Sequence, residues 1–250
     1  MNVIEEGEFK YVEQGQGETL VLLHGLMGAL SNWNGVLDHF SKKYRVVIPL
    51  LPIFDMPLKK VGVKGLAEYL DRFLLHKNYG EVHLIGNSLG GHVGLYYYAN
   101  KKSQTKTLTL TGSSGLYERA MGDTYPKRGS YIYIKEKVEV TFYDPKTATR
   151  ELVDEVFETI NNRNRVIRIL AMAKSAIRHN MKEDLKTMHL PVCLIWGKND
   201  NITPPQVAEE FRDTLPNAEL LWIDKCGHAP MMEHPEVFNK LLDTFLEKHV

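Results

Sequence analysis

The chain has 250 residues, and its 31 Lys and Arg residues balance its 31 Asp and Glu residues. This balance gives no electrostatic reason to expect a nucleic-acid or anionic-membrane partner, and no apolar stretch reaches the roughly 18 residues of a membrane span. No basic segment precedes an apolar one at residues 1–6, so we expect no signal peptide and a cytoplasmic location. The two cysteines, Cys193 and Cys226, lack metal-ligand spacing, which favours buried reduced thiols over a structural zinc site.

The first half of the chain alternates short apolar strands with amphipathic helices. Strands are expected at residues 9–13, 19–23, 45–50, 82–85 and 107–111, and helices at 32–43, 63–78 and 91–99. The run 19–23 is almost wholly apolar, which is typical of a strand buried on both faces. Three prolines make 49–57 irregular. Such alternation predicts an α/β fold with a mostly parallel central sheet flanked by helices.

The alternation stops between residues 116 and 190. Apolar residues at helical spacing predict helices around 152–160 and 166–177, while 131–142 fits a helix or a strand, and we favour a helix. Strands at 191–197 and 218–223, with helices at 206–215 and 236–246, then resume the alternation. We therefore predict a core of residues 1–115 and 191–250, with 116–190 as an inserted helical segment, called the insertion below.

The run Gly86-Asn87-Ser88-Leu89-Gly90 lies between a predicted strand and a predicted helix. A Gly-x-Ser-x-Gly sequence at such a junction predicts a nucleophile elbow, a sharp turn that exposes the serine oxygen at the sheet edge. Glycines are needed two residues before and after the serine, because a side chain there would strike the neighbouring strand or helix. Ser88 is therefore the candidate nucleophile.

A serine hydroxyl needs a base within hydrogen-bond reach and an acid that orients the base. His228 follows the strand 218–223 on a loop and is the candidate base. Asp200 follows the strand 191–197, which gives the chain order Ser88, Asp200, His228 expected of this type of fold. Asp224 competes for the role of the acid, but it stands only four residues before His228 and too early on its strand. We therefore assign the acid to Asp200.

Acyl transfer also needs backbone N–H groups aimed at the developing oxyanion. One donor is expected from Leu89, directly after the nucleophile. The other should come from the loop after the strand 19–23, at Leu26 or Met27, and we prefer Leu26. His24, in the same loop, is expected to brace the loop and not to transfer protons.

Together these motifs resemble the α/β-hydrolase fold family over essentially the whole chain. The matching residues are His24-Gly25 with Gly28, Gly86 to Gly91, Gly197 with Asp200, and Gly227-His228. The resemblance implies a cofactor-independent serine hydrolase with a helical cap, here the insertion, over a site for a small-molecule substrate. One departure is the segment from Pro49 to Asp55, where relatives usually carry Asp-x-Pro-Gly-x-Gly.

A narrower resemblance concerns the carbon–carbon bond hydrolases that cleave meta-ring-fission products. It rests on Gly-Asn-Ser-Leu-Gly-Gly at 86–91 and on Tyr143-Asp144-Pro145 followed by Glu151-Leu152-Val153. Such an enzyme would be expected to have a polar or cationic group in the cap to hold the substrate carboxylate. The candidate cations are Arg119, Arg128, Arg163, Arg165 and Arg168.

Three functions therefore stay open at the level of sequence. Hydrolysis of a small-molecule ester or thioester through an acyl-enzyme is the leading hypothesis, and a serine at the elbow argues against a haloalkane dehalogenase, which resembles this fold but uses aspartate there. Carbon–carbon bond hydrolysis of a ring-fission diketone is the first alternative, and a slow-turnover ligand receptor is the second. We expect no metal, no nucleic-acid or membrane partner, and a monomer or homodimer.

Overall fold

The computed structural model describes residues 1–27, 30–101, 104–117 and 127–249. Over these residues the chain forms an eight-stranded sheet in the order β1-β2-β4-β3-β5-β6-β7-β8. The strands are β1 (Ile4–Glu6), β2 (Phe9–Gln14), β3 (Thr19–Leu23), β4 (Arg45–Pro49), β5 (Val82–Asn87), β6 (Thr105–Thr111), β7 (Val192–Gly197) and β8 (Ala218–Ile223). The β1–β2 and β2–β4 pairs are antiparallel and the other five pairs are parallel, which confirms the mostly parallel sheet. The short strand β1 was not expected.

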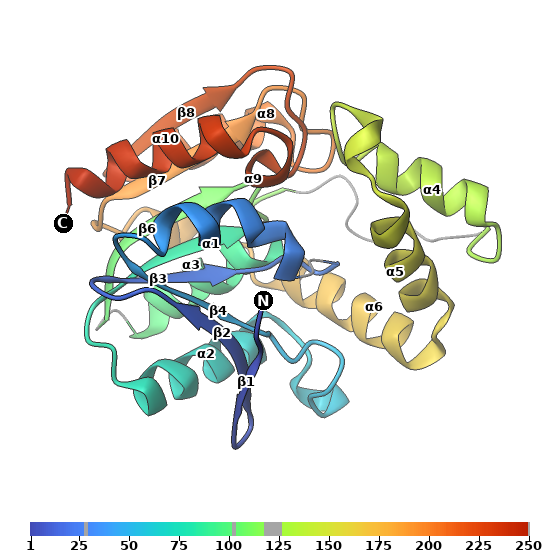
Figure 1. The fold of residues 1–250 in the computed structure, drawn as a ribbon, viewed down its shortest axis with the longest axis horizontal. Helices are drawn as coiled ribbons and strands as arrows, with labels where there is room; N and C mark the ends of the chain where they lie inside the picture. Colours follow the sequence, from blue (N-terminus) through green and yellow to red (C-terminus); the bar gives the residue numbers. More distant parts are fainter. Residues whose placement is uncertain (28–29, 102–103, 118–126, 250) are drawn as a thin grey trace.

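Helices cover both faces of this sheet (Figure 1). The core helices are α1 (Asn34–Phe40), α2 (Val63–Lys77), α3 (Leu89–Lys101), α8 (Pro205–Thr214), α9 (Pro230–Glu233) and α10 (Pro235–Glu247), with short 3-10 helices η1 (Leu30–Trp33) and η2 (Leu58–Lys60). Side chains alternate between the faces of a strand, so Val21 and Leu23 join the cluster under α2, α3 and α8, while Leu20 and Leu22 join the cluster under α1 and α10. The predicted α/β fold, with a mostly parallel sheet between two layers of helices, is thereby confirmed.

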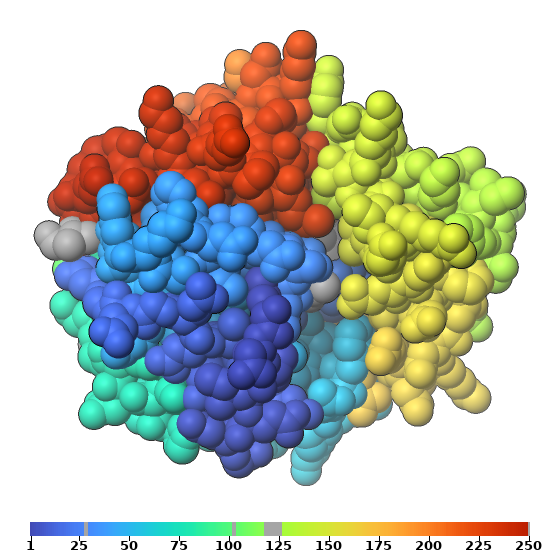
Figure 2. Space-filling model, viewed as in Figure 1, coloured from blue at the N-terminus to red at the C-terminus, as the bar shows by residue number. Residues whose placement is uncertain are grey.

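The described part of the insertion is helical. It contains α4 (Tyr131–Glu139), η3 (Pro145–Thr147), α5 (Arg150–Asn161), α6 (Arg163–Arg178) and α7 (Lys182–Leu185). The ambiguous segment 131–142 therefore begins with a helix, as favoured. Figures 1 and 2 show α4, α5 and α6 gathered at one end of the sheet. In Figure 2 the insertion, coloured green to yellow, adjoins both the N-terminal part of the core, in blue, and its C-terminal part, in red. Gly28 and Arg119, which the sequence singled out, lie outside the described residues.

Buried side chains anchor the insertion to both halves of the hydrophobic core. Val138 of α4 and Val156 of α5 belong to the same cluster as α1 and α10, whereas Met172 and Ala176 of α6 belong to the cluster of α2 and α3. Burial of valine and methionine side chains stabilises such a contact by about 1.5–3 kcal/mol each. The insertion thus packs across the end of the sheet at which the parallel strands finish.

Two further sequence expectations concern cysteines and membranes. Cys193 and Cys226 are buried free thiols, and burial raises the pKa of both, so neither is an activated nucleophile. Within the described ranges no helix combines the length and apolar character needed to cross a bilayer.

Candidate active site

Ser88 occupies the turn between β5 and α3. Its φ of 53° is in the left-handed region, which non-glycine residues rarely adopt and which often marks a functional turn. A Cβ on Gly86 would lie 2.4 Å from the Gly91 Cα, and a Cβ on Gly90 would lie 2.1 Å from the Leu23 carbonyl oxygen. Glycine is therefore required on both sides of the turn, for the steric reason that the motif implied.

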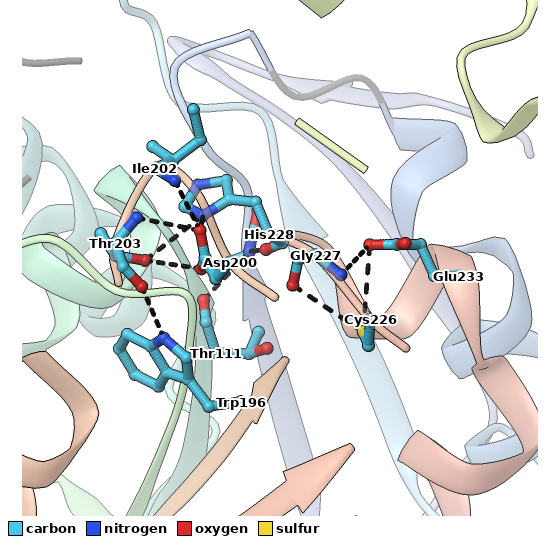
Figure 3. Close-up of polar contacts among 10 residues, drawn as sticks. Thr111, Trp196, Asp200, Ile202, Thr203, Cys226, Gly227, His228 and Glu233 are labelled. Atoms are coloured by element: carbon cyan, nitrogen blue, oxygen red, sulfur yellow. Dashed lines mark hydrogen bonds and ion pairs between the residues drawn. The ribbon is translucent and has the colours of Figure 1, made fainter. Parts of the chain in front are cut away.

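His228 lies on the loop between β8 and α9, next to Asp200 from the loop after β7 (Figure 3). Its Nδ1 is 2.9 Å from the Asp200 Oδ2 and 3.2 Å from Oδ1. An ionised carboxylate only accepts hydrogen bonds, so Nδ1 carries the proton and Nε2 is the basic nitrogen. This is the tautomer that a general base for a serine hydroxyl requires.

Hydrogen-bond donors from Ile202 and Thr203 hold the Asp200 carboxylate in place. Its Oδ1 accepts the N–H groups of Ile202 and Thr203 at 2.8 and 2.9 Å, and its Oδ2 accepts the Thr203 hydroxyl at 2.8 Å. The carboxylate has no solvent-exposed surface, so these donors replace water around a buried charge. Asp224, the competing acid, is 71% exposed at its side chain and lies 3.8 Å from the Lys198 ammonium.

The main chain of His228 is held from two directions. Its N–H donates to the Thr141 carbonyl of the insertion at 2.9 Å, while its carbonyl accepts from the Asn87 side chain at 3.2 Å. Asn87 directly precedes Ser88 and also donates to the Thr111 carbonyl of β6 at 3.0 Å. The candidate base is therefore fixed in position relative to both the elbow and the insertion.

The loop after β3 lies against the elbow. A Cβ on Gly25 would be 3.3 Å from the Ser88 Cβ, which shows how closely the two segments approach. His24 accepts the Leu51 N–H at Nε2 (3.0 Å) and donates from Nδ1 to the Gly25 carbonyl (2.8 Å). Burial lowers the pKa of His24, which keeps the ring neutral for this double role.

This bracing also orients one candidate oxyanion donor. In a trans peptide the C=O and the following N–H point in opposite directions, so fixing the Gly25 carbonyl on His24 turns the Leu26 N–H away from His24. Leu89 is the first residue of α3, where an N–H group has no intrahelical acceptor. Leu26, Met27 and Leu89 all line the same cavity as Ser88.

That cavity has a volume of about 230 Å³ and lies between the elbow and the insertion. Ser88 and His228 both line it, together with Asn87, Ser114 and Ile202 of the core. Apolar side chains from three helices of the insertion and the turn after α4 complete the wall: Val138, Phe142, Leu152, Val156, Ile169, Leu170, Met172, Ala173 and Ala176. Two polar residues of the insertion, Lys137 and Thr141, also line the cavity.

The candidate arginines among the described residues lie outside the wall of the cavity. Arg165 stacks over the Phe54 ring at 5.3 Å and donates to the Thr159 hydroxyl, and Arg168 donates to the Asn164 carbonyl. Arg128, Arg163, Arg165 and Arg168 are all absent from the lining of the cavity. Among the described charged side chains, only Lys137 contributes to that lining.

Sequence reasoning missed three residues that support this arrangement: Asn87, Thr203 and Glu233. The Asp-x-x-Thr spacing of Asp200 and Thr203 is a local signal that an aspartate caps the turn that follows it, so the role of Thr203 could have been predicted from the sequence. Asn87 and Glu233 act through contacts with segments distant in the chain, which no local pattern indicates. Within the described residues, no group of three His, Cys, Asp or Glu side chains could hold a metal ion.

Comparison with known proteins agrees with the geometry. The family model described as alpha/beta hydrolase fold matches residues 18–235. The crystal structure of MGS-MChE2, an alpha/beta hydrolase enzyme from the metagenome of lagoon sediments at Mar Chica, Morocco, is 46% identical, covers 99% of both chains and superposes with a TM-score of 0.83.

Two curated relatives are more distant. A 2-hydroxy-6-oxononadienedioate/2-hydroxy-6-oxononatrienedioate hydrolase of Burkholderia vietnamiensis is 27% identical over 99% of this chain and 95% of its own length. The dihydrolipoyllysine-residue acetyltransferase component of an acetoin cleaving system from Pseudomonas putida is 29% identical over 94% of this chain, which spans 65% of that relative. With the family model matching most of its length, the chain belongs to the α/β-hydrolase fold family and is a hydrolase of that fold.

Proposed function

We propose that this hydrolase cleaves small-molecule esters, with Ser88 as the nucleophile, His228 as the general base and Asp200 as the group that orients it. The observation that carries the proposal is the 2.9 Å contact between the His228 Nδ1 and the buried Asp200 carboxylate, with His228 on the wall of the cavity that Ser88 also lines. Serine, imidazole and carboxylate in this relation form the arrangement that activates a hydroxyl for acyl transfer.

In the proposed reaction, the Ser88 Oγ attacks the ester carbonyl while the His228 Nε2 takes its proton. The oxyanion accepts hydrogen bonds from the N–H groups of Leu89 and Leu26. Collapse of this intermediate breaks the bond to the alcohol, which leaves with the proton from His228. Water then attacks the acyl-enzyme by the same route, releases the acid and restores Ser88. No step needs a cofactor.

The insertion, residues 116–190, is proposed to act as a cap over this site. Support comes from α4, α5 and α6, which line the cavity almost entirely with apolar side chains. Burying a charged group against such a wall is unfavourable, whereas each buried methylene contributes about 0.8 kcal/mol. We therefore propose a neutral ester whose portion beneath the insertion is apolar.

Carbon–carbon bond hydrolysis of a ring-fission diketone is the second candidate. The curated name of the Burkholderia relative and the presence of Lys137 on the cavity wall favour it. The four described candidate arginines, Arg128, Arg163, Arg165 and Arg168, do not favour it, because their side chains do not line the cavity. A cytoplasmic location and a monomeric or dimeric state remain predictions from the sequence.

The test compares wild type with Ser88→Ala on p-nitrophenyl hexanoate and on the p-nitrophenyl monoester of adipic acid, which carries a carboxylate at the far end. We expect many turnovers of the neutral ester and a loss of at least about 10³-fold in kcat on substitution of the nucleophile. Ser41→Ala, outside the lining of the cavity, is the matched control. Turnover retained by Ser88→Ala would refute the assignment. Near-stoichiometric product from wild type would instead support a receptor, and cleavage of a ring-fission diketone alone would support the second candidate.

A further inference from the structure

Glu233, the last residue of α9, joins two segments that lie far apart in the chain. Its Oε1 accepts the N–H of Gly227 at 2.8 Å, and its Oε2 accepts the N–H of Tyr143 in the insertion at 2.7 Å. Figure 3 shows its carboxylate beside Cys226 and Gly227, on the loop that carries His228. One carboxylate therefore binds the base-bearing loop and the insertion together.

The two segments are also in direct contact. A Cβ on Gly227 would lie 2.6 Å from the Thr141 carbonyl oxygen and 2.9 Å from the Phe142 Cα, so only glycine allows this approach. The neighbouring His228 N–H donates to the same Thr141 carbonyl at 2.9 Å. Residues 141–143 and 226–228 thus run against each other, and the first of these segments supplies Thr141 and Phe142 to the cavity wall.

The surroundings of Glu233 suit an ionised carboxylate that accepts from the main chain. Burial raises the pKa of Glu233, and hydrogen bonds from the backbone of Tyr143, Gly227 and Ala229 oppose that rise. Hydrogen bonds from backbone N–H groups to a carboxylate are charge-assisted and about twice as strong as neutral ones. The two N–H groups bind different oxygens of the carboxylate, so a side chain with one acceptor oxygen could not keep both hydrogen bonds in this geometry.

We propose that Glu233 is a positioning residue that aligns the cavity wall and the candidate base as one unit, a role that rests on the proposed ester hydrolysis. Removing one acceptor leaves residues 141–143 joined to the His228 loop only by the His228 N–H to Thr141 carbonyl bond and the packing at Gly227, so their alignment is less well fixed. The imidazole then loses its fixed place relative to Ser88, while the apolar lining that binds substrate stays largely in place. Displacements of about 1 Å at reacting groups lower rates by up to about 10²-fold.

The experiment replaces Glu233 by Gln, which keeps the size of the side chain but turns one acceptor into a donor that faces a backbone N–H. With p-nitrophenyl hexanoate we expect kcat to fall about 10- to 100-fold and KM to change by less than about threefold. Glu236→Gln, an exposed carboxylate three residues later, is the matched control and should behave as wild type. An unchanged kcat in folded Glu233→Gln would overturn the proposal.

A double-mutant cycle separates positioning from general destabilisation. Because Phe142 belongs to the segment that Glu233 holds, Glu233→Gln and Phe142→Ala should be non-additive in kcat/KM by at least about fivefold. Leu170 on α6 lines the same cavity but lies outside that segment, so Leu170→Ala should combine with Glu233→Gln additively within about twofold. Equal additivity in both cycles would contradict the coupling.

Amide hydrogen exchange tests the contact independently of any activity. The amides of Tyr143 and Gly227 should be protected in wild type and exchange at least about tenfold faster in Glu233→Gln, because each opening is easier by about 1.4 kcal/mol or more. If the two amides are equally protected in both proteins, the proposal is overturned. If the wild type shows this exchange pattern but does not turn over esters, only the proposed ester hydrolysis is overturned. If Glu233→Gln does not fold, Glu233→Asp, which keeps the charge but shortens the reach, is measured in the same way.

Discussion

We expect His92 to make the stability of this protein depend on pH. It lies in α3 behind the elbow, has no solvent-exposed surface, and donates from Nε2 to the His179 carbonyl at 2.8 Å. Its Nδ1 is buried without a hydrogen-bond partner among the described residues. Burial lowers the pKa of His92 to about 4, because an imidazolium there would lack solvation; the hydrogen bond to the His179 carbonyl opposes this shift, and the His179 ring adds a smaller electrostatic lowering.

The sign and size of the effect follow from linkage. The folded pKa lies below the unfolded value of about 6.5, so the unfolded chain binds more protons as the pH falls. The stabilisation is therefore complete above pH ~6.5 and is lost progressively as the pH falls towards the folded pKa. For a folded pKa of about 4, one such group lowers the free energy of unfolding by about 2 kcal/mol between pH 7 and pH 5.

Urea unfolding of wild type and His92→Gln at pH 7, 6 and 5 measures this directly. Glutamine retains an N–H donor for the His179 carbonyl but does not titrate, so the free energy of unfolding of wild type should fall about 2 kcal/mol more than that of the variant over this range. His24 and His83 also have pKa values lowered by burial, and they contribute equally to both proteins. Parallel pH dependences for the two proteins would refute the reasoning, whatever their difference at pH 7.

Two further predictions concern residues that orient the site. In Asp200→Asn the amide nitrogen would face the His228 Nδ1 and favour a proton on Nε2, so kcat should fall by about 10⁴-fold with little change in KM; steady-state kinetics showing less than about a tenfold loss would contradict this role. In His24→Phe the Leu51 N–H and the Gly25 carbonyl lose their partners, so the free energy of unfolding should fall by about 1–3 kcal/mol and kcat by at least about tenfold. Urea unfolding and ester kinetics check it, and a stability loss without a kcat effect would separate His24 from the oxyanion loop.

Local sequence patterns predicted most of the strands and helices of the fold. The apolar run of β3 and the helical spacing of α2 indicated their elements because periodicity reports which faces are buried. Short elements escaped this reasoning: β1 and α9 have three and four residues, too few for a period to appear. Chain order after the elbow also indicated Asp200, and the structure brings this carboxylate, and not that of Asp224, to His228.

The sequence by itself determined the elbow, since the steric demand for glycine at 86 and 90 arises between immediately neighbouring elements. Tertiary structure alone decided what surrounds Ser88. The spacing of the insertion's arginines could not reveal that Arg165 turns towards Phe54 while apolar residues of α5 and α6 face the cavity. Nor could it reveal that Glu233 meets Tyr143, because that hydrogen bond joins residues 90 positions apart. Such contacts depend on how the insertion packs against the sheet, and local periodicity carries no information about that packing.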